Sequence, residues 1–372
     1  MKGCGENLWV GGGTAVPHQS TNPPIHQSSI RGSALIVVLW VIGLMGLLVG
    51  SFAFDAHLES RITSYYRKRT RATALAESGI EVGKLLMLKM EKVDPKAEVP
   101  AGEDDDPWYA PARQLEATGA VHQELALGEG TVVLDIVTEQ ALRSVNHLKK
   151  EEEWEPVLAV VGVPEEMWPE LIEAFLDWTD PDDEARVDGA ETEDYYKTLD
   201  PPYRARNGDL YSVDELLSIK GFTRAIVYGG ALDPESEDPV MITAGGLSGL
   251  LTVFGDPKIN VNAAPYNVLL TLPSGARNDG DLVAEDIVEE RAGTSNIYGV
   301  VEDNFFTGDA DMFGRMPSLN EAERRDYVTA EPASLYYRIT ARGRVNNVTR
   351  TISCVVKNNG GTLSYLQWTE EE

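Results

Sequence analysis

The acidic segment between Asp180 and Asp194 is the part of the chain whose residues could do chemistry. It carries eight carboxylates against one basic residue, Arg186. Carboxylates crowded in this way favour a cation, and calcium prefers several hard oxygen ligands. A solvated acidic loop is the alternative interpretation. The candidate calcium ligands are Asp180, Asp182, Asp183, Glu184, Asp188, Glu191 and Asp194.

The spacing of these acids matches a calcium-binding EF-hand only in part. With Asp180 in the first position, the third, fifth, ninth and twelfth positions are Asp182, Glu184, Asp188 and Glu191. An EF-hand has glycine in the sixth position, where this chain has Ala185, and it needs a second helix after the loop. No clear helix pattern follows, so we expect a site of another geometry.

No motif for catalysis accompanies the acidic segment. The chain has no nucleophile motif, phosphate-binding loop, dinucleotide fingerprint or histidine spacing typical of a metal site. His57, His122 and His147 have no obvious partners in sequence, and we interpret them as structural. Two cysteines at opposite ends of the chain exclude a disulfide framework and a cysteine zinc cluster. We therefore do not expect an enzyme, and a membrane-anchored hydrolase is the least supported alternative.

A helix must lead into the acidic segment. Residues 169–178 place apolar side chains on one helical face, directly after a proline suited to a helix start. Two later stretches, residues 212–222 and 259–291, resemble helix-hairpin-helix units, which can bind DNA backbones. Their turns are poor in Lys and Arg, and the chain has a net charge of -28. Nucleic acid is therefore an unlikely partner.

The N-terminal part predicts one long helix. Residues 34–54 are 21 uncharged, mostly apolar residues, enough to cross a bilayer of about 30 Å. A cleaved secretory signal is the alternative, but the run continues into an amphipathic stripe from Ala72 to Met90. We predict a single helix from Ser33 to Met90, half of it in lipid and half against a globular domain.

Strand patterns flank the helical region of the chain. Residues 131–137 alternate and are β-branched, and we expect this strand to pack on the long helix. Residues 335–339 and 348–356 alternate around an Asn-Asn turn, which is typical of a β-hairpin. Cys354 falls within this pattern and should be a small buried residue. The predicted fold class is α+β.

The start of the long helix resembles a type IV prepilin or type II secretion pseudopilin. Arg31 and Gly32 precede the small residue Ser33 and the apolar run. The resemblance implies cleavage by a prepilin peptidase between Gly32 and Ser33. Most pilins have glutamate as the fifth mature residue, where this chain has Val37. Among pseudopilins, this substitution is characteristic of the minor pseudopilin K family.

Later segments resemble the same family. Residues 176–184, 189–191, 195–196 and 199–203 are similar to the helical insertion of pseudopilin K, a region linked to calcium in that family. Residues 260–264, 334–339 and 366–368 resemble its later segments and closing strands. The resemblance implies a pilin-like fold, in which a transmembrane helix packs on an antiparallel sheet that carries a large α-helical insertion with helix-hairpin-helix or SAM-like units.

The resemblance also implies a domain organisation. The expected parts are a cleaved leader (1–32), an N-terminal helix (33–92, transmembrane about 34–54), a first part of the pilin-like domain (93–149), the helical insertion with the acidic loop (150–250), a second helix-hairpin-helix-like unit (251–328) and the C-terminal strands (329–372).

The implied function is assembly. A minor pseudopilin K caps the pseudopilus tip with minor pseudopilins I and J, and it meets other secretion-system components and exported proteins. Its anchor lies in the inner membrane with the C-terminal domain in the periplasm. The basic residues between Arg61 and Arg71 favour the opposite orientation, because the positive-inside rule would place the C-terminal part in the cytoplasm. The alternative function is a membrane-tethered calcium-binding or DNA-binding module of a competence-type pilus.

Overall fold

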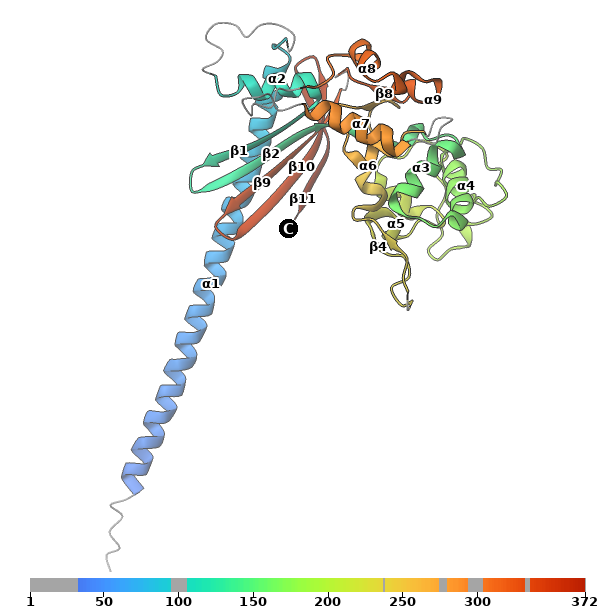
Figure 1. The fold of residues 1–372 in the computed structure, drawn as a ribbon. Helices are drawn as coiled ribbons and strands as arrows, with labels where there is room; N and C mark the ends of the chain where they lie inside the picture. The colour runs from blue at the N-terminus through green and yellow to red at the C-terminus, as the bar shows by residue number, and fades with distance from the viewer. Residues whose placement is uncertain are drawn as a thin grey trace, which may run out of the picture. The chain divides into compact units, whose positions relative to one another are not determined.

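The structure is a computed structural model that describes residues 33–94, 106–236, 238–273, 280–293, 304–331 and 335–371 (Figure 1). The leader with Gly32, most of the proline-rich connection after the long helix, and Ser334 lie outside the described residues. The chain divides into two compact units, residues 1–64 and 65–372, which we describe separately.

The first unit contains the apolar half of helix α1 (Ser33–Met90), which is one helix of 58 residues, as predicted. Its large apolar side chains from Leu35 to Phe54 are between 48% and 74% exposed. Such a surface is costly in water, at about 25 cal/mol per Å² of apolar area. The helix is long and apolar enough to cross a membrane, which is compatible with a single-pass anchor.

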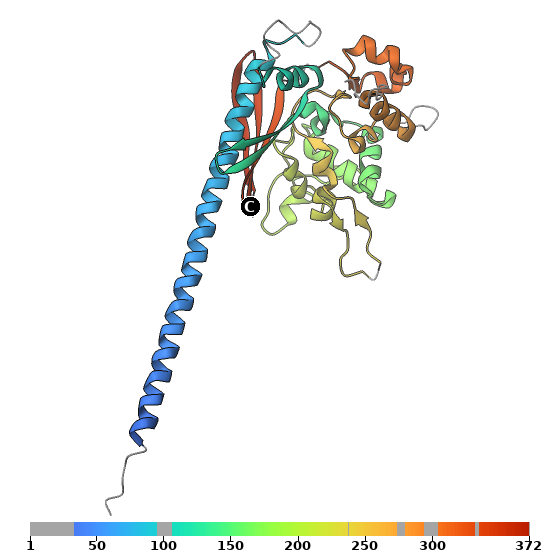
Figure 2. The same ribbon diagram turned by 60° about the vertical axis from the view of Figure 1, so that its left-hand side comes forward.

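The second unit is built around a five-stranded antiparallel sheet with strand order β1-β2-β9-β10-β11. Figure 2 shows this sheet against the later part of α1. The strands are β1 (Ala120–Leu127), β2 (Gly130–Thr138), β9 (Tyr336–Val345), β10 (Val348–Asn359) and β11 (Thr362–Glu371). Strands β2, β9 and β10 confirm the predicted strand and hairpin.

The amphipathic half of α1 packs on one face of the sheet. Ile80 and Met87 of the helix are fully buried and belong to one core cluster with Leu134 of β2 and Ile339 of β9. The helix approaches closely at Gly79, where an added Cβ would lie 2.6 Å from a methyl carbon of Val132. Glycine is therefore required by space at this crossing rather than by backbone conformation.

The remaining residues fold mainly as a helical insertion between β2 and β9. Its helices are α3 (Glu151–Val161), α4 (Trp168–Thr179), α5 (Arg224–Tyr228), α6 (Tyr266–Leu269), α7 (Gly280–Ala292), α8 (Asp309–Arg315) and α9 (Ala322–Arg325), and α2 (Tyr109–Thr118) precedes the sheet. Two-residue strand pairs join distant parts of the insertion: β3 (Arg143–Ser144) with β6 (Leu251–Thr252), β4 (Gly230–Ala231) with β5 (Met241–Ile242), and β7 (Ile259–Asn260) with β8 (Val328–Thr329).

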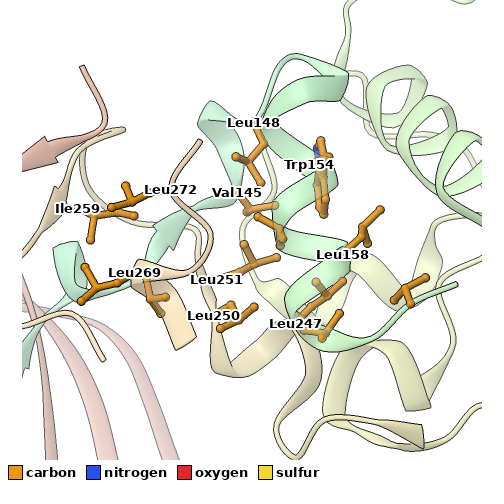
Figure 3. Packing of buried hydrophobic residues seen from close by; sticks show 14 of the residues in the cluster. Val145, Leu148, Trp154, Leu158, Leu247, Leu250, Leu251, Ile259, Leu269 and Leu272 are labelled. Atoms are coloured by element: carbon orange, nitrogen blue, oxygen red, sulfur yellow. The ribbon is translucent and has the colours of Figure 1, made fainter. Parts of the chain in front are cut away.

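The insertion has its own hydrophobic core, part of which is drawn in Figure 3. Trp154 and Leu158 of α3 point into it beside Leu247 and Leu251. The Trp154 ring is fully buried and meets the Phe175 ring edge to face, with centroids 4.7 Å apart. This core fixes the position of α4, the helix that leads into the acidic segment.

The two stretches that resemble helix-hairpin-helix units contain short helices. After Ser212, whose hydroxyl caps the backbone N–H of Asp214, the chain forms a 3-10 helix (Val213–Ser218) rather than an α-helix, and α5 follows. The second stretch contains α6 and α7. The helix-hairpin-helix assignment itself stays a prediction.

Candidate functional site

Helix α4 places Asp177 at the start of the acidic segment. The helix begins at Trp168 with a proline in its first turn, and its buried face carries Leu171, Phe175 and Trp178. Asp177 lies on this same face and is fully buried. A buried carboxylate needs donors, and its Oδ2 accepts hydrogen bonds from the backbone N–H groups of Arg186 (3.1 Å) and Ala190 (2.9 Å).

Asp177 thus holds the chain that folds back over α4. At Gly189 an added Cβ would lie 1.9 Å from Oδ2 of Asp177. A side chain at this position would push the loop away from the carboxylate. The glycine therefore belongs to the site because it lets the backbone approach.

Arg186 forms ion pairs with three carboxylates. Its Nη1 lies 2.5 Å from Oδ1 of Asp177 and 2.6 Å from Oδ2 of Asp180, and its Nε lies 3.3 Å from Oε2 of Glu173. One guanidinium therefore supplies the positive charge at this end of the acidic segment. Charge-assisted hydrogen bonds of this kind are stronger than neutral ones.

Three buried oxygen atoms nearby accept no hydrogen bond from any described residue: Oδ1 of Asp180, Oε1 of Glu191 and Oδ1 of Asn207. Burial, together with the smaller effect of the charges of Asp177, Asp180 and Asp183, raises the pKa of Glu191 to about 7. Asn207 is anchored beside them because its Nδ2 donates to Oδ1 of Asp183 and to the carbonyl oxygen of Asp182. These acceptors are all oxygen atoms, the ligand type that calcium prefers.

The predicted ligands fall into two groups. Asp180 and Glu191 each carry one of the buried oxygen atoms without a hydrogen bond, and Asp183 accepts a hydrogen bond from Asn207. Asp182 instead accepts a hydrogen bond from the backbone N–H of Glu184. Glu184, Asp188 and Asp194 are exposed, and their carboxylates make no hydrogen bond or ion pair with the described residues.

The candidate site is not a preassembled metal cage. Within the described ranges, no group of three carboxylate, histidine or cysteine side chains is close enough to hold a metal ion. The three buried oxygen atoms without hydrogen bonds are nevertheless the ones that a cation would attract. A calcium ion would need Asp180, Glu191 and the Asn207 amide to converge.

Charge counting along the acidic segment missed Asp177, Arg186 and Asn207 as organising residues. Asp177 had a detectable signal, because it is a carboxylate on the apolar face of a helix. Asn207 lies more than twenty residues from its partners, so no local pattern identifies it.

The N-terminal processing residues are only partly described. Ser33 is the first residue of α1, whereas Gly32 lies outside the described residues. Val37 lies in the second turn of α1 with 59% of its surface exposed. The helix therefore presents an apolar side chain where most pilins have a glutamate.

Comparisons with known proteins agree with this architecture. Residues 135–229, which include the acidic segment, match the family model of type II secretion system protein K. The fold is similar to a chain in the crystal structure of the GspK-GspI-GspJ complex from the type II secretion system of enterotoxigenic Escherichia coli. The TM-score is 0.52 at 16% sequence identity, covering 84% of this chain and 99% of that chain. The comparison with curated proteins found no match.

The structural similarity confirms the predicted pilin-like α+β fold with its long N-terminal helix and antiparallel sheet. The family-model match adds sequence evidence from the end of β2 through the first half of the insertion. The two comparisons thus agree, since the family model is that of type II secretion system protein K and the structure is that of a GspK-GspI-GspJ complex.

Proposed function

We propose that this chain is the minor pseudopilin K of a type II secretion system. It would cap the tip of the periplasmic pseudopilus together with minor pseudopilins I and J and so support export of folded proteins. The observation that carries the proposal is the combination of a protein K segment at residues 135–229 with a GspK-like fold over most of the chain.

The exposed apolar half of α1 supports an assembly role. A helix of this kind is stable in lipid, and packing against neighbouring helices can replace lipid contacts when a subunit leaves the membrane. Val37 leaves the helix without the carboxylate that would pair with the N-terminal ammonium of another subunit. A subunit with no earlier neighbour does not need that pair, so Val37 favours the tip position.

Processing and assembly can be tested with the full chain. Co-expression with a prepilin peptidase should yield a product whose intact mass corresponds to cleavage between Gly32 and Ser33. The cleaved chain should then co-purify with minor pseudopilins I and J of its own system. An uncut chain, a cut elsewhere, or no complex with processed partners would contradict the proposal. A Gly32→Ala variant, which should stay uncut, is the matched control for cleavage.

We propose in addition that calcium binds the acidic segment. Asp180, Glu191 and the side-chain amide oxygen of Asn207 would hold it, because these oxygen atoms are buried without hydrogen bonds from the described residues. The ion would neutralise the carboxylates that Arg186 does not pair and would stiffen the loop. It needs no catalytic role.

Calcium titration of the full chain tests this second proposal. Wild type should bind one calcium ion at this site, and Asp180→Asn and Glu191→Gln should each weaken binding. Asp194→Asn is the control, since Asp194 is exposed and is not among the residues with a buried oxygen atom that lacks a hydrogen bond. Equal loss in all three variants, or no binding by the wild type, would refute the assignment.

A further inference from the structure

A polar cleft of about 470 Å³ lies between the sheet and the helical insertion. Its floor is the face of β9, β10 and β11 that does not contact α1, and its wall is formed by residues 212–214 and 248–254 of the insertion. The volume falls within the range of small-molecule sites in proteins, roughly 300–1,000 Å³. No residue of the acidic segment lines this cleft.

The floor presents two neighbouring rows of polar side chains across the strands. Strand register places Thr340 opposite Ser353, and their hydroxyl oxygens lie 3.1 Å apart. The adjacent row places Arg342 opposite Thr351, which in turn lies opposite Glu371. Hydroxyl, guanidinium and carboxylate groups therefore alternate at the spacing of neighbouring strands, about 4.8 Å.

The positive charges of the floor are already compensated. Nε of Arg338 lies 2.9 Å from Oε1 of Glu139, whose side chain is fully buried, and Nη1 of Arg342 lies 2.8 Å from Oδ2 of Asp135. Glu371 adds a further negative charge to the lining. The cleft has no surplus of positive charge, which argues against a phosphate or carboxylate ligand.

The same ion pairs fix the two guanidinium groups, whose remaining N–H groups can donate hydrogen bonds to a ligand. Among the described residues, Nη1 and Nη2 of Arg338 and Nε and Nη2 of Arg342 have no protein acceptor. Glu371 and Gln367 supply acceptors on the same floor. The complementary ligand is therefore neutral overall and carries closely spaced groups that both donate and accept hydrogen bonds, as sugar hydroxyls do.

A polypeptide strand fits the face of this sheet less well. Backbone pairing needs a free strand edge, whereas β9 and β10 each pair on both sides, and of the three strands of the floor only β11 has an unpaired edge. Phe254 adds an aromatic ring to the wall, stacked on Tyr336 with centroids 5.8 Å apart, and gives an apolar surface for the C–H face of a sugar ring. Sheet faces bind oligosaccharides in other folds.

We propose that this cleft binds a short stretch of a neutral glycan, with Arg338 and Arg342 donating to its hydroxyl or acetamido oxygens. The glycan could be an amino-sugar polymer of a cell wall or a plain hexose polymer carried as cargo or substrate. Both polymers carry neutral, closely spaced groups that donate and accept hydrogen bonds, and two tetrasaccharide probes distinguish between them.

The test is calorimetric titration of the full chain in lipid nanodiscs, since sugar-based detergents would compete. The probes are the β-1,4-linked tetramer of N-acetylglucosamine and cellotetraose, with tetragalacturonate as the acidic counterpart. We expect saturable binding of one neutral tetramer in the micromolar to millimolar range and weaker binding of the uronate. The neutral tetramer that binds more tightly identifies the source.

Arg342→Met should raise Kd by at least about tenfold, the loss expected for hydrogen bonds to a charged donor. Arg344→Met is the matched control, because Arg344 lies two residues further on the same strand face and donates to the carbonyl oxygen of Asn346 instead. Thr351→Trp fills the floor and gives a second variant should Arg342→Met fold poorly.

Three results would overturn the proposal: no saturable binding of either neutral tetramer at millimolar concentration, equal effects of the Arg342 and Arg344 variants, or tighter binding of the uronate. Cleavage by the prepilin peptidase and co-purification with minor pseudopilins I and J are independent readouts. Failure of the glycan proposal therefore leaves the proposed function separately testable.

Discussion

Replacing Asp177 with asparagine should loosen the loop that carries the acidic segment. The buried carboxylate accepts hydrogen bonds from two backbone N–H groups through one oxygen and from the Arg186 guanidinium through the other. Asparagine keeps the shape but has only one oxygen. Its NH2 group must then face either the guanidinium or the two backbone N–H groups, which are donors.

The size of the effect follows from burial. Removing one partner of a buried ion pair costs about 3–5 kcal/mol. The side chain of Arg186 is 37% exposed and keeps its pairs with Asp180 and Glu173. We therefore expect a smaller loss, about 2–4 kcal/mol in the free energy of loop opening.

Hydrogen exchange of the full chain, followed by mass spectrometry, measures this loss. The amides of Arg186 and Ala190 should exchange roughly 30-fold faster or more, since about 1.4 kcal/mol is a factor of ten. Asp182→Asn is the control, because Asp182 is exposed and its carboxylate accepts only from the backbone N–H of Glu184 among the described residues. Unchanged exchange in Asp177→Asn, or equal acceleration in the control, would refute the anchoring role.

Three further predictions concern stability. Burial raises the pKa of Glu191 from 4.5 to about 7, so the contribution of this residue to stability is intact below pH 4.5 and declines as pH rises toward 7. With calcium chelated, the free energy of urea unfolding of Glu191→Gln should equal that of the wild type at pH 4 and exceed it at pH 8. Gly79→Ala should cost about 1–3 kcal/mol by overpacking against β2, despite the helix propensity gained, whereas Ser78→Ala on the exposed side should stay within about 0.5 kcal/mol. Glu139→Gln should lower the midpoint of thermal unfolding, with a cost of about 1–3 kcal/mol, because it removes the ion pair with Arg338; an unchanged midpoint would contradict this.

The long helix was predictable because its signals are local. An uncharged apolar run leads without a proline into an amphipathic stripe, so one 58-residue helix follows from neighbouring residues alone. Strand β2 and the β9–β10 hairpin were also predictable from neighbouring residues, because their apolar and polar residues alternate and an Asn-Asn turn joins the two strands of the hairpin. Strand β1 was missed because this edge strand, AVHQELAL, does not alternate regularly between apolar and polar residues and contains only one β-branched residue.

The candidate site depended more on distant contacts. Counting charges located the acidic segment but weighted its exposed and buried carboxylates equally. The helical face decides that Asp177 is buried, and tertiary folding decides that Asn207 comes back to the same place. Whether Arg186 or a metal ion neutralises a given carboxylate likewise depends on distances in the folded chain, which a count of charged residues does not give.

The antiparallel pairing of β2 with β9 has a consequence for how the domain folds. These neighbouring strands, with Thr138 opposite Tyr337, are separated by the whole insertion. Closing a chain of this length in place of a short hairpin turn adds about 3–4 kcal/mol of entropy cost, from the logarithmic dependence on loop length. If the insertion collapses around its own core first, its two ends are already close, and the sheet then closes at little further cost. The insertion would thus act as a folding template for the strands that enclose it, and domains with shorter connections would not need one.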